Sequence, residues 1–221
     1  MSASEQKETF ELELKNPFTM MIAGPTKSGK TTFVDNLVEN AEALYSKPPN
    51  KFFYFYNQAQ PKHKGLQSNI FEFIEGVPTS KWISETYESF GPNFTIIIDD
   101  QAFNINKEVA ELFTVGSSRR ECNVIYLTQN LFTNKQEQRD ISINCSYIVL
   151  FKNPRDAVSA HRFFGQLDPK NSGILLDIYR EATEKPYSYL IIDLHQTTSD
   201  KNRYISNIFS EHDETPALYR F

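Results

Sequence analysis

Residues 18–44 contain the feature that most constrains the fold, because three local patterns follow one another directly. Phe18–Ala23 is apolar and stops at a glycine, as a buried parallel strand would. Gly24–Thr31 reads Gly-Pro-Thr-Lys-Ser-Gly-Lys-Thr and matches the pattern G-x-x-x-x-G-K-[ST]. Apolar side chains then recur with helical spacing over Thr31–Leu44. The order predicts a strand, a phosphate-binding loop and a helix; the alternative is an ordinary glycine-rich turn beside a helix.

Each residue type in this loop has a chemical role. Gly24 and Gly29 permit a tight turn whose N–H groups approach phosphate oxygens, and the helix N-terminus adds a favourable dipole. Lys30 would place its ammonium on the β- and γ-phosphates, and the Thr31 hydroxyl would ligate Mg²⁺. The predicted cofactors are therefore ATP and Mg²⁺. The predicted nucleotide-binding residues are Gly24, Pro25, Thr26, Lys27, Ser28, Gly29, Lys30, Thr31 and Thr32.

A second acidic motif follows the apolar run Phe94–Ile98, where Asp99 and Asp100 stand at a strand end. We predict that Asp99 holds Mg²⁺ through water and that Asp100 polarises the water that attacks the γ-phosphate. Phe52–Tyr56 precedes this strand, which is consistent with ATPases whose acidic strand is separated from the loop strand by an inserted strand. A solvated pair of aspartates is the alternative.

Polar and arginine candidates complete the predicted catalytic set. Val124–Thr128 reads as a strand, and Gln129 at its end is predicted to sense the γ-phosphate or the water. A local hydrogen bond at a strand end is the alternative role. An arginine from a neighbouring subunit often neutralises transition-state charge in ring ATPases. The candidates are Arg119 and Arg120, with Arg139 and Arg155 as alternatives.

Strands and helices alternate along almost the whole chain, which predicts an α/β fold with a mostly parallel central sheet and helices on both faces. We expect one domain over residues 1–221, with a core of about 10–195 and a C-terminal extension of about 196–221. Other expected strands are Phe10–Leu14, Tyr147–Phe151 and Tyr187–Leu194, with Phe71–Ile74 and Arg203–Phe209 as further candidates. Other expected helices are Lys81–Phe90, Val109–Val115, Pro154–Phe164 and one containing Gly173–Tyr179.

Composition excludes several classes. The net charge of −5 gives no basic whole-chain footprint for passive nucleic-acid binding, although a local basic surface remains compatible with it. Cys122 and Cys145 form neither a disulfide framework nor a zinc spacing. The N-terminal residues lack a signal-peptide core and no apolar run reaches about 20 residues. We therefore expect a soluble, intracellular protein with no membrane contact.

Four segments together resemble a known family. They are Gly24–Thr31, Ile96-Ile-Ile-Asp-Asp100, Val124-Ile-Tyr-Leu-Thr-Gln-Asn-Leu-Phe132 and Tyr147-Ile-Val-Leu-Phe-Lys-Asn-Pro-Arg-Asp156. The combination is similar to viral DNA-packaging ATPases of the FtsK/HerA superfamily, most of all to those of Polintons, virophages and related double-stranded DNA viruses. The likeness runs from about Phe18 to Phe164. Its specific part is the second half, since a phosphate loop alone is shared with dozens of families.

The resemblance implies a RecA-like P-loop fold, ring assembly as a pentamer or hexamer, and ATP-driven movement of double-stranded DNA into a preformed capsid. It implies capsid or portal vertex proteins as partners, and a virus assembly site in the nucleus or a cytoplasmic factory as the location. Two departures stand out: Lys27 replaces a frequent glycine, and Ser117-Ser-Arg-Arg120 stands where relatives carry His-rich or Arg-bearing sequence. Predicted phosphate-contacting lysines for DNA are Lys62, Lys64, Lys135 and Lys152.

Other functions compete with the motor. A small-molecule kinase would use the same loop but usually carries an arginine-rich lid, which the sequence does not clearly contain. A GTPase would need Asn-Lys-x-Asp after a strand, and Asn134-Lys135-Gln-Glu137 is a poor copy. A nucleotide-gated assembly protein would bind the metal at Asp99 and Asp100 without turnover. No Leu-Ser-Gly-Gly-Gln-like signature supports an ABC-type ATPase.

Overall fold

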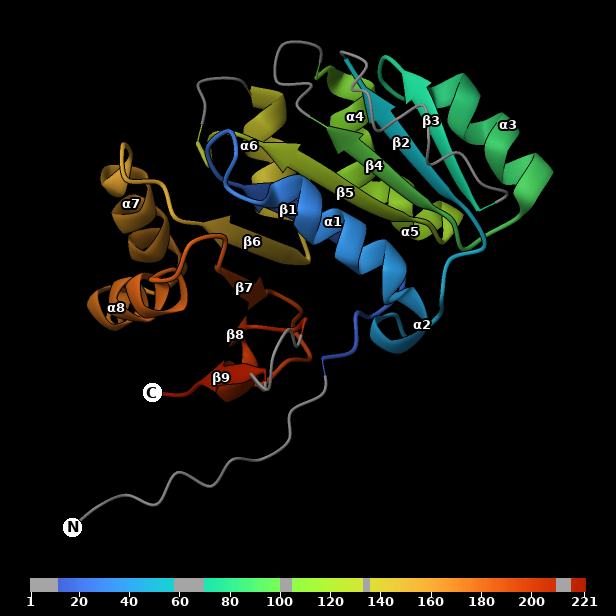
Figure 1. The fold of residues 1–221 in the computed structure, drawn as a ribbon. Coiled ribbons are helices and arrows are strands. Elements are labelled where there is room, and N and C mark those ends of the chain that lie inside the picture. Colours follow the sequence, from blue (N-terminus) through green and yellow to red (C-terminus); the bar gives the residue numbers. More distant parts are fainter. Residues whose placement is uncertain (1–11, 58–69, 100–104, 133–135, 210–215) are drawn as a thin grey trace.

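The computed structural model describes residues 12–57, 70–99, 105–132, 136–209 and 216–221, and a nine-stranded sheet forms its centre (Figure 1). The strand order is β3-β2-β4-β5-β1-β6-β7-β8-β9. The strands are β1 (Thr19–Ala23), β2 (Phe52–Tyr56), β3 (Phe71–Glu75), β4 (Thr95–Asp99), β5 (Asn123–Thr128), β6 (Tyr147–Phe151), β7 (Tyr189–Asp193), β8 (Tyr204–Ser206) and β9 (Ala217–Tyr219).

The sheet is parallel from β3 to β6 and antiparallel from β7 to β9. In β1, β4, β5 and β6 every residue is buried, as expected for strands covered on both faces. The expectation of an α/β fold with a mostly parallel sheet is confirmed. The antiparallel strands β8 and β9 come from the predicted C-terminal extension and join the same sheet.

Helices cover both faces of the sheet. The sheet divides the core into two apolar clusters, one on each face. Phe33, Val34 and Leu37 of α1 pack on one face, together with residues of α2. Ile83, Ile141 and Leu175 belong to the cluster on the other face. The helices are α1 (Lys30–Glu39), α2 (Ala41–Leu44), α3 (Ser80–Phe90), α4 (Lys107–Glu111), α5 (Ser117–Arg120), α6 (Gln136–Asn144), α7 (Ala157–Leu167) and α8 (Ser172–Ala182), with a π-helical turn at Leu112–Gly116 and a 3₁₀ turn at Asp200–Asn202.

Local geometry corrects several sequence-based boundaries. The helix expected over Thr31–Leu44 is broken at Asn40, whose side chain donates to the Asn36 carbonyl. The helix expected from Pro154 starts at Ala157, because the Asp156 carboxylate caps it by accepting the Ser159 N–H at 3.1 Å.

Three further segments differ from the expectation. Helix α6 was not predicted, because its polar sequence buries only Gln138 and Ile141. Strand β9 was also missed, since its three residues are too few to show a period. The described part of the expected strand Phe10–Leu14 forms an isolated bridge between Leu14 and Tyr45. Residues 10 and 11 lie outside the described residues.

The strand inserted between the loop strand and the acidic strand is β5. It pairs with β1 on one side and with β4 on the other, whereas β2 lies beyond β4. The predicted insertion is therefore present, but the inserted strand is β5 and not β2. Strand β5 ends at Thr128, so Gln129, the predicted sensor, follows a strand that lies between the loop strand β1 and the acidic strand β4.

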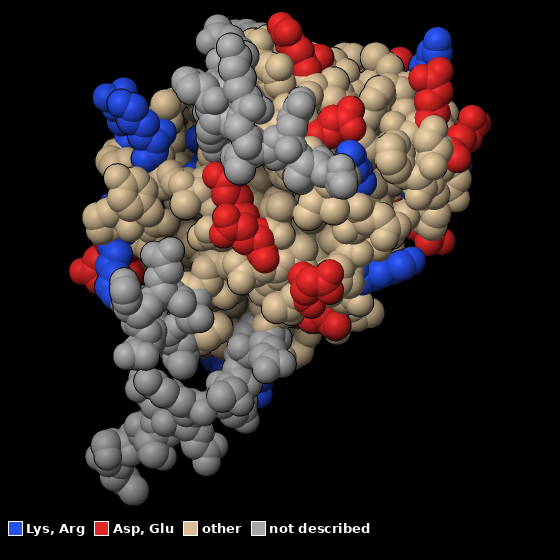
Figure 2. Space-filling model, turned by 45° about the vertical axis from the view of Figure 1, so that its right-hand side comes forward, with Lys and Arg blue, Asp and Glu red and all other residues tan. Residues whose placement is uncertain are grey.

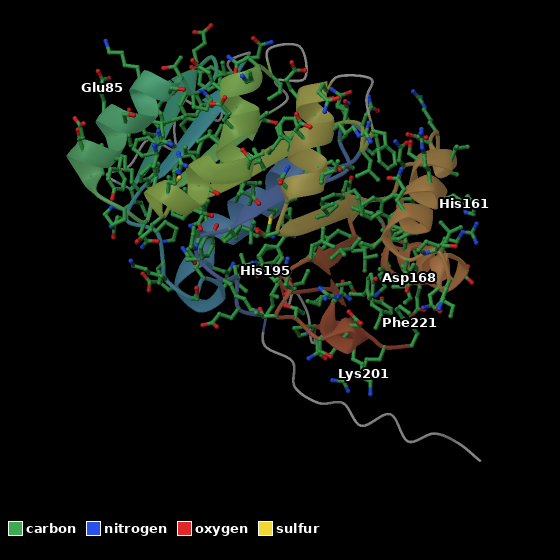
Figure 3. All side chains as sticks on the ribbon, turned by 180° about the vertical axis from the view of Figure 1, so that it is seen from behind. Glu85, His161, Asp168, His195, Lys201 and Phe221 are labelled. Carbon is green, nitrogen blue, oxygen red and sulfur yellow. The ribbon has the colours of Figure 1, made fainter. Side chains whose placement is uncertain are left out.

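Charged side chains are mixed on the visible surface. On the face drawn in Figure 2, Lys and Arg side chains stand apart from one another among Asp, Glu and uncharged residues. His161 on α7 and His195 after β7 lie far apart in Figure 3. Over the described ranges, no three His, Cys, Asp or Glu side chains are grouped as metal ligands, and no helix is both long and apolar enough to cross a membrane.

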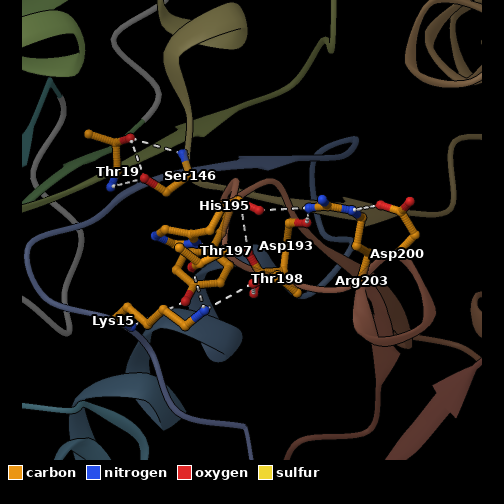
Figure 4. Close-up of polar contacts among 10 residues, drawn as sticks. Lys15, Thr19, Ser146, Asp193, His195, Thr197, Thr198, Asp200 and Arg203 are labelled. Carbon is orange, nitrogen blue, oxygen red and sulfur yellow. Dashed lines mark hydrogen bonds and ion pairs between the residues drawn. The ribbon is translucent and has the colours of Figure 1, made fainter.

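A polar cluster fastens the chain after β7 to the N-terminal segment (Figure 4). The Asp193 carboxylate accepts from the backbone N–H of His195 at 2.9 Å and from the Thr198 hydroxyl at 2.8 Å, and it contacts the His195 ring at 2.7 Å. The Lys15 ammonium donates to the Thr198 hydroxyl at 3.0 Å. Arg203 donates to the Asp193 carbonyl at 3.0 Å. Asp193 pairs with the first residue of β6, so the cluster lies at the edge of the sheet opposite the carboxyl ends of the parallel strands.

Burial of the Asp193 carboxyl opposes its ionisation, but the hydrogen bonds from His195 and Thr198 outweigh burial and hold its pKa below the usual value. The ionised form is therefore favoured in the folded state. Its contribution to stability is present above the pKa of the unfolded chain, about 4, and is lost as pH falls through the folded pKa.

We expect Asp193→Asn to lower the free energy of unfolding at pH 7 by about 1–3 kcal/mol, because buried donors lose an anionic acceptor. The difference from wild type should shrink as pH falls below about 4, where the wild-type carboxylate also becomes protonated. Urea unfolding at a series of pH values measures it. Asp200→Asn is the control, because that side chain is 93% exposed and its ion pair with Arg203 contributes at most about 1 kcal/mol. An Asp193→Asn difference that is equal at pH 3 and pH 7 would contradict the prediction.

Candidate functional site

The loop between β1 and α1 lies at the carboxyl edge of the parallel strands, beside the end of β5 (Figure 1). The Gly24 N–H donates to the Thr128 carbonyl at 3.2 Å, which ties the start of the loop to β5. Gly29 immediately precedes α1 with φ 107°, a left-handed conformation that glycine adopts without steric cost. Its carbonyl accepts the first helical bond, from the Phe33 N–H at 2.9 Å. The first turn of α1 therefore directs its N–H groups toward the loop, which is the arrangement that binds anions.

The Lys30 side chain folds back onto the loop that precedes it. Its ammonium donates to the carbonyl oxygens of Gly24 at 2.7 Å and Pro25 at 3.0 Å. Both positively charged residues of the loop, Lys27 and Lys30, thus lie where an anion would enter, and Lys27 is exposed. The loop supplies N–H dipoles and two ammonium groups to the same space.

Phe151, the last residue of β6, packs behind the loop. A Cβ atom added at Gly24 would lie 2.6 Å from the Phe151 Cβ and 2.8 Å from the Ser28 Oγ. A Cβ added at Gly29 would lie 3.2 Å from the Phe151 ring. Packing against Phe151 therefore excludes a side chain at Gly24 and crowds one at Gly29, where the positive φ also favours glycine. Sequence analysis missed Phe151, because nothing in the chain marks β6 as the neighbour of the loop.

Asp99 ends β4 on the same face of the sheet as α1, and the Tyr54 hydroxyl donates to its Oδ2 at 2.5 Å. The Thr31 hydroxyl lies close enough to the same phenol to favour its ionised form, so the Tyr54 side chain stands near both predicted metal ligands. Asp35, one turn further along α1, lies close enough to influence Tyr54 electrostatically. The two residues predicted to hold Mg²⁺ are thus brought together, although β5 separates their strands.

Tyr54 is buried, and burial raises the pKa of its hydroxyl well above its usual range. The negative charge of Asp99 and the hydrogen bond to it raise that pKa further. The phenol is therefore protonated at every working pH and remains a donor to Asp99. One carboxylate oxygen is fixed by this bond, which orients the other.

Gln129 follows β5 and is exposed at the same edge as the loop. With loop residues and the segment after β6 it lines a cleft of about 730 Å³. The lining residues are Pro25, Thr26, Lys27, Gln129, Asn130, Asn153, Pro154, Arg155 and Asp156. Of the four arginine candidates, Arg155 is the one that lines this cleft.

The remaining predicted residues lie elsewhere. Arg119 and Arg120 belong to α5, which precedes the amino end of β5 and therefore lies at the opposite edge of the sheet. They line a separate hollow with Glu108 and Glu111. A role for them at a phosphate loop would require the loop of another copy of the chain, and this stays a prediction. Asp100, together with Lys62, Lys64 and Lys135, lies outside the described residues.

The arrangement can bind a polyphosphate anion and a divalent cation. The loop N–H groups, Lys27 and Lys30 match phosphate oxygens, while the Thr31 hydroxyl and the Asp99 carboxylate are the hard oxygen ligands that Mg²⁺ prefers. Tyr54 could have been recognised from the sequence only by assuming that β2 pairs with β4. All five residues of β2 are aromatic, in the order Phe-Phe-Tyr-Phe-Tyr, so the polar role of one of them is not marked locally.

No protein-family model matches the sequence, and neither does any curated protein sequence. Among solved structures, the flagellar accessory protein FlaH of Methanocaldococcus jannaschii is similar with a TM-score of 0.43 and 13% identity, covering 62% of this chain and 71% of FlaH. The ATPase DotB of Legionella pneumophila has a TM-score of 0.38 and 12% identity, covering 60% of this chain and 40% of DotB. The Thermotoga maritima RuvB Holliday junction branch migration motor has a TM-score of 0.38 and 11% identity, covering 75% of this chain and 49% of RuvB.

This chain thus spans about half or less of the last two proteins. The phosphate loop after β1, the helix that follows it and the β4-β5-β1 order together define a RecA-like P-loop NTPase fold.

Gly24→Ala should displace the loop, because a Cβ at 2.6 Å from the Phe151 Cβ forces backbone to move. We expect ATP affinity to fall by at least about tenfold, since phosphate recognition depends on the positions of the loop N–H groups. Isothermal titration calorimetry with ATP and Mg²⁺ measures it.

Gly165→Ala in α7 is the matched control, because nothing lies within 4 Å of the added Cβ. It should leave ATP affinity unchanged and stabilise the fold by about 0.5–1 kcal/mol through helix propensity. Unaltered affinity in Gly24→Ala would mean that the loop does not hold phosphate.

Tyr54→Phe removes the donor to Asp99 and keeps the ring. We expect the Mg²⁺ concentration that half-saturates binding of a fluorescent ATP analogue to rise several-fold, because the Asp99 carboxylate is no longer oriented. The free energy of unfolding should fall by about 1 kcal/mol. Tyr126→Phe is the control: its hydroxyl is also buried and accepts from Gln138 at 2.8 Å, but it faces the other apolar cluster. Equal Mg²⁺ dependence in the two variants would rule out the positioning role of Tyr54.

Proposed function

We propose that the chain is an ATP-hydrolysing motor that moves double-stranded DNA into a preformed viral capsid. The observation that carries the ATPase part is the convergence of the Lys30 loop, Asp99 and Gln129 at one edge of the sheet, with Tyr54 bonded to Asp99 and close to Thr31. The DNA-packaging part rests on the sequence likeness of the segments around β5 and β6 to packaging ATPases.

The chain's own groups suit phosphoryl transfer to water. Bound Mg²⁺ would neutralise charge on the β- and γ-phosphates, and Thr31 and Asp99 are the residues that would hold it. Lys30 can release its bonds to the Gly24 and Pro25 carbonyls and donate to phosphate oxygens instead. Gln129 would orient a water at the γ-phosphate through its side-chain amide, and Asp100 is the proposed residue that polarises this water.

Basic side chains on the same edge support contact with a DNA backbone. Lys152 and Arg155 follow β6 and are exposed, and Arg155 shares its cleft with Lys27. Contacts of this kind are directed at phosphates and weaken with salt. In a ring of five or six copies the cleft would face a neighbouring subunit. Arg119 or Arg120 of that neighbour would then reach into the cleft and neutralise charge on the transferred phosphate. Capsid or portal vertex proteins are the further proposed partners.

ATP hydrolysis with Mg²⁺ should be detectable and should increase severalfold with long double-stranded DNA at low salt. Raising the salt from about 50 to about 200 mM should abolish most of the stimulation, because counterion release makes phosphate contacts steeply salt-dependent. Lys30→Ala should reduce turnover to background with or without DNA, since it removes the ammonium group that would contact the γ-phosphate. A coupled phosphate-release assay measures all three.

Lys81→Ala is the control and should leave turnover unchanged, because it removes a lysine of α3 whose side chain is 84% exposed and which lines neither cavity beside the loop. Turnover that DNA does not change would overturn the motor and keep the ATPase. Phosphorylated product in a nucleoside screen would identify a kinase instead. Tight ATP binding without any release of phosphate would identify a nucleotide-gated assembly protein.

A further inference from the structure

A large cavity opens beside the phosphate loop, on the side away from Gln129. It has a volume of about 870 Å³, within the range of small-molecule sites. Its wall combines the start of α1, the end of β6, the segment between α8 and β7, and the segment after β8. The lining residues used below are Asn36, Phe151, Tyr187, Tyr189, Asn207 and Phe209.

The floor of this cavity is built from packed aromatic rings. Phe33 meets Tyr189 edge-to-face at 4.7 Å between ring centroids and meets Phe209 at 5.2 Å. The Tyr189 hydroxyl lies close to the backbone of Ile208 and Phe209, and the Tyr189 ring packs on the Phe209 ring at 6.3 Å between centroids. The floor is therefore apolar and fixed before any ligand arrives.

Tyr187 forms the rim between the floor and the phosphate loop. Its side chain is largely exposed, at 71%, and its Cβ lies 3.4 Å from the position of a Cβ built at Gly29. A tyrosine held in the open next to a phosphate loop loses the burial that usually stabilises such a ring, so the fold alone gives no reason for it.

The backbone is also strained around this cavity. Five non-glycine residues of the described chain have positive φ, and three of them line the cavity: Lys27 at 64°, Tyr187 at 66° and Asn207 at 55°. For a bulky residue such as tyrosine this conformation costs free energy, and residues held in it concentrate at ligand-binding sites.

We propose that this cavity is the nucleoside subsite of the phosphate loop, in which the Tyr187 ring stacks on the base of a ribonucleoside triphosphate. The proposal rests on the proposed nucleotide-binding function and adds the part of the site that the loop motif does not contain. A triphosphate on Lys30 and Thr31 places its ribose toward Thr32 and Asn36, which line the same cavity. The amides of Asn36 and Asn207 then lie on the wall around the sugar and base.

Stacking explains why the subsite needs an exposed aromatic ring. Every base has a π-face, so a ring at the rim binds it without reading its hydrogen-bonding groups. The triphosphate and the base are thus held by different residues, and their contributions to binding can be separated by experiment.

The test compares ATP with inorganic tripolyphosphate, which occupies the loop but has no base. We expect Tyr187→Ala to weaken ATP binding by about tenfold or more and to leave tripolyphosphate binding unchanged. Tyr187→Phe should keep wild-type affinity, because the ring is retained. Tyr87→Ala, which removes an exposed tyrosine of α3 remote from the loop, should change neither. Competition with a fluorescent triphosphate measures both affinities.

Three results would overturn the subsite. They are equal weakening of ATP and tripolyphosphate in Tyr187→Ala, no weakening of either, or a wild-type protein that binds ATP no more tightly than tripolyphosphate. Failure of the proposed function gives a different result, because wild type would then bind neither compound and Lys30→Ala would change nothing.

Discussion

The packing of Phe151 against the phosphate loop is the contact on which the candidate site depends. Gly24 and Gly29 both face this side chain, and a methyl group at Gly24 would overlap it. The contact exists because β6 pairs with β1 in parallel, so both strands end at the same edge. The loop is thus formed against a rigid, buried surface, which keeps its N–H groups directed at one point. A motif of eight residues becomes a binding site only when this neighbour is in place.

A second contact links Asp99 to the neighbouring strand β2. Strand β5 lies between β1 and β4, so Thr31 and Asp99 belong to elements separated by a strand. Tyr54 of β2 donates to Asp99, and Thr31 lies near the same phenol. Burial and the adjacent carboxylate keep the phenol protonated, so it remains a donor to Asp99. The orientation of Asp99 is therefore set by β2, a strand outside the two motifs.

The antiparallel end of the sheet supplies the aromatic wall of the cavity beside the loop. Strands β7 and β8 bring Tyr187, Tyr189 and Phe209 to the side of the loop that the parallel strands leave open. At the opposite edge, the Asp193 cluster fastens the same strands to Lys15. The C-terminal residues are consequently part of the sheet that holds the site, and the cavity they form is the place where an uncharged part of a ligand can bind.

The sequence by itself determined the local elements of this protein. The apolar run before Gly24, the G-x-x-x-x-G-K-[ST] pattern and the strand ending at Asp99 are periodic or steric signals carried by neighbouring residues, so the parallel α/β fold and the loop followed from them. The polar segment that forms α6 and the start of α7 at Ala157 gave weaker signals, because capping and tertiary burial fixed their bounds. Only the tertiary structure decided that β5 is the inserted strand, that Phe151 and Tyr54 support the loop and Asp99, and that Tyr187 stands at its rim. Strand order and long-range packing join residues many positions apart, and no local pattern of side chains records which of them will meet.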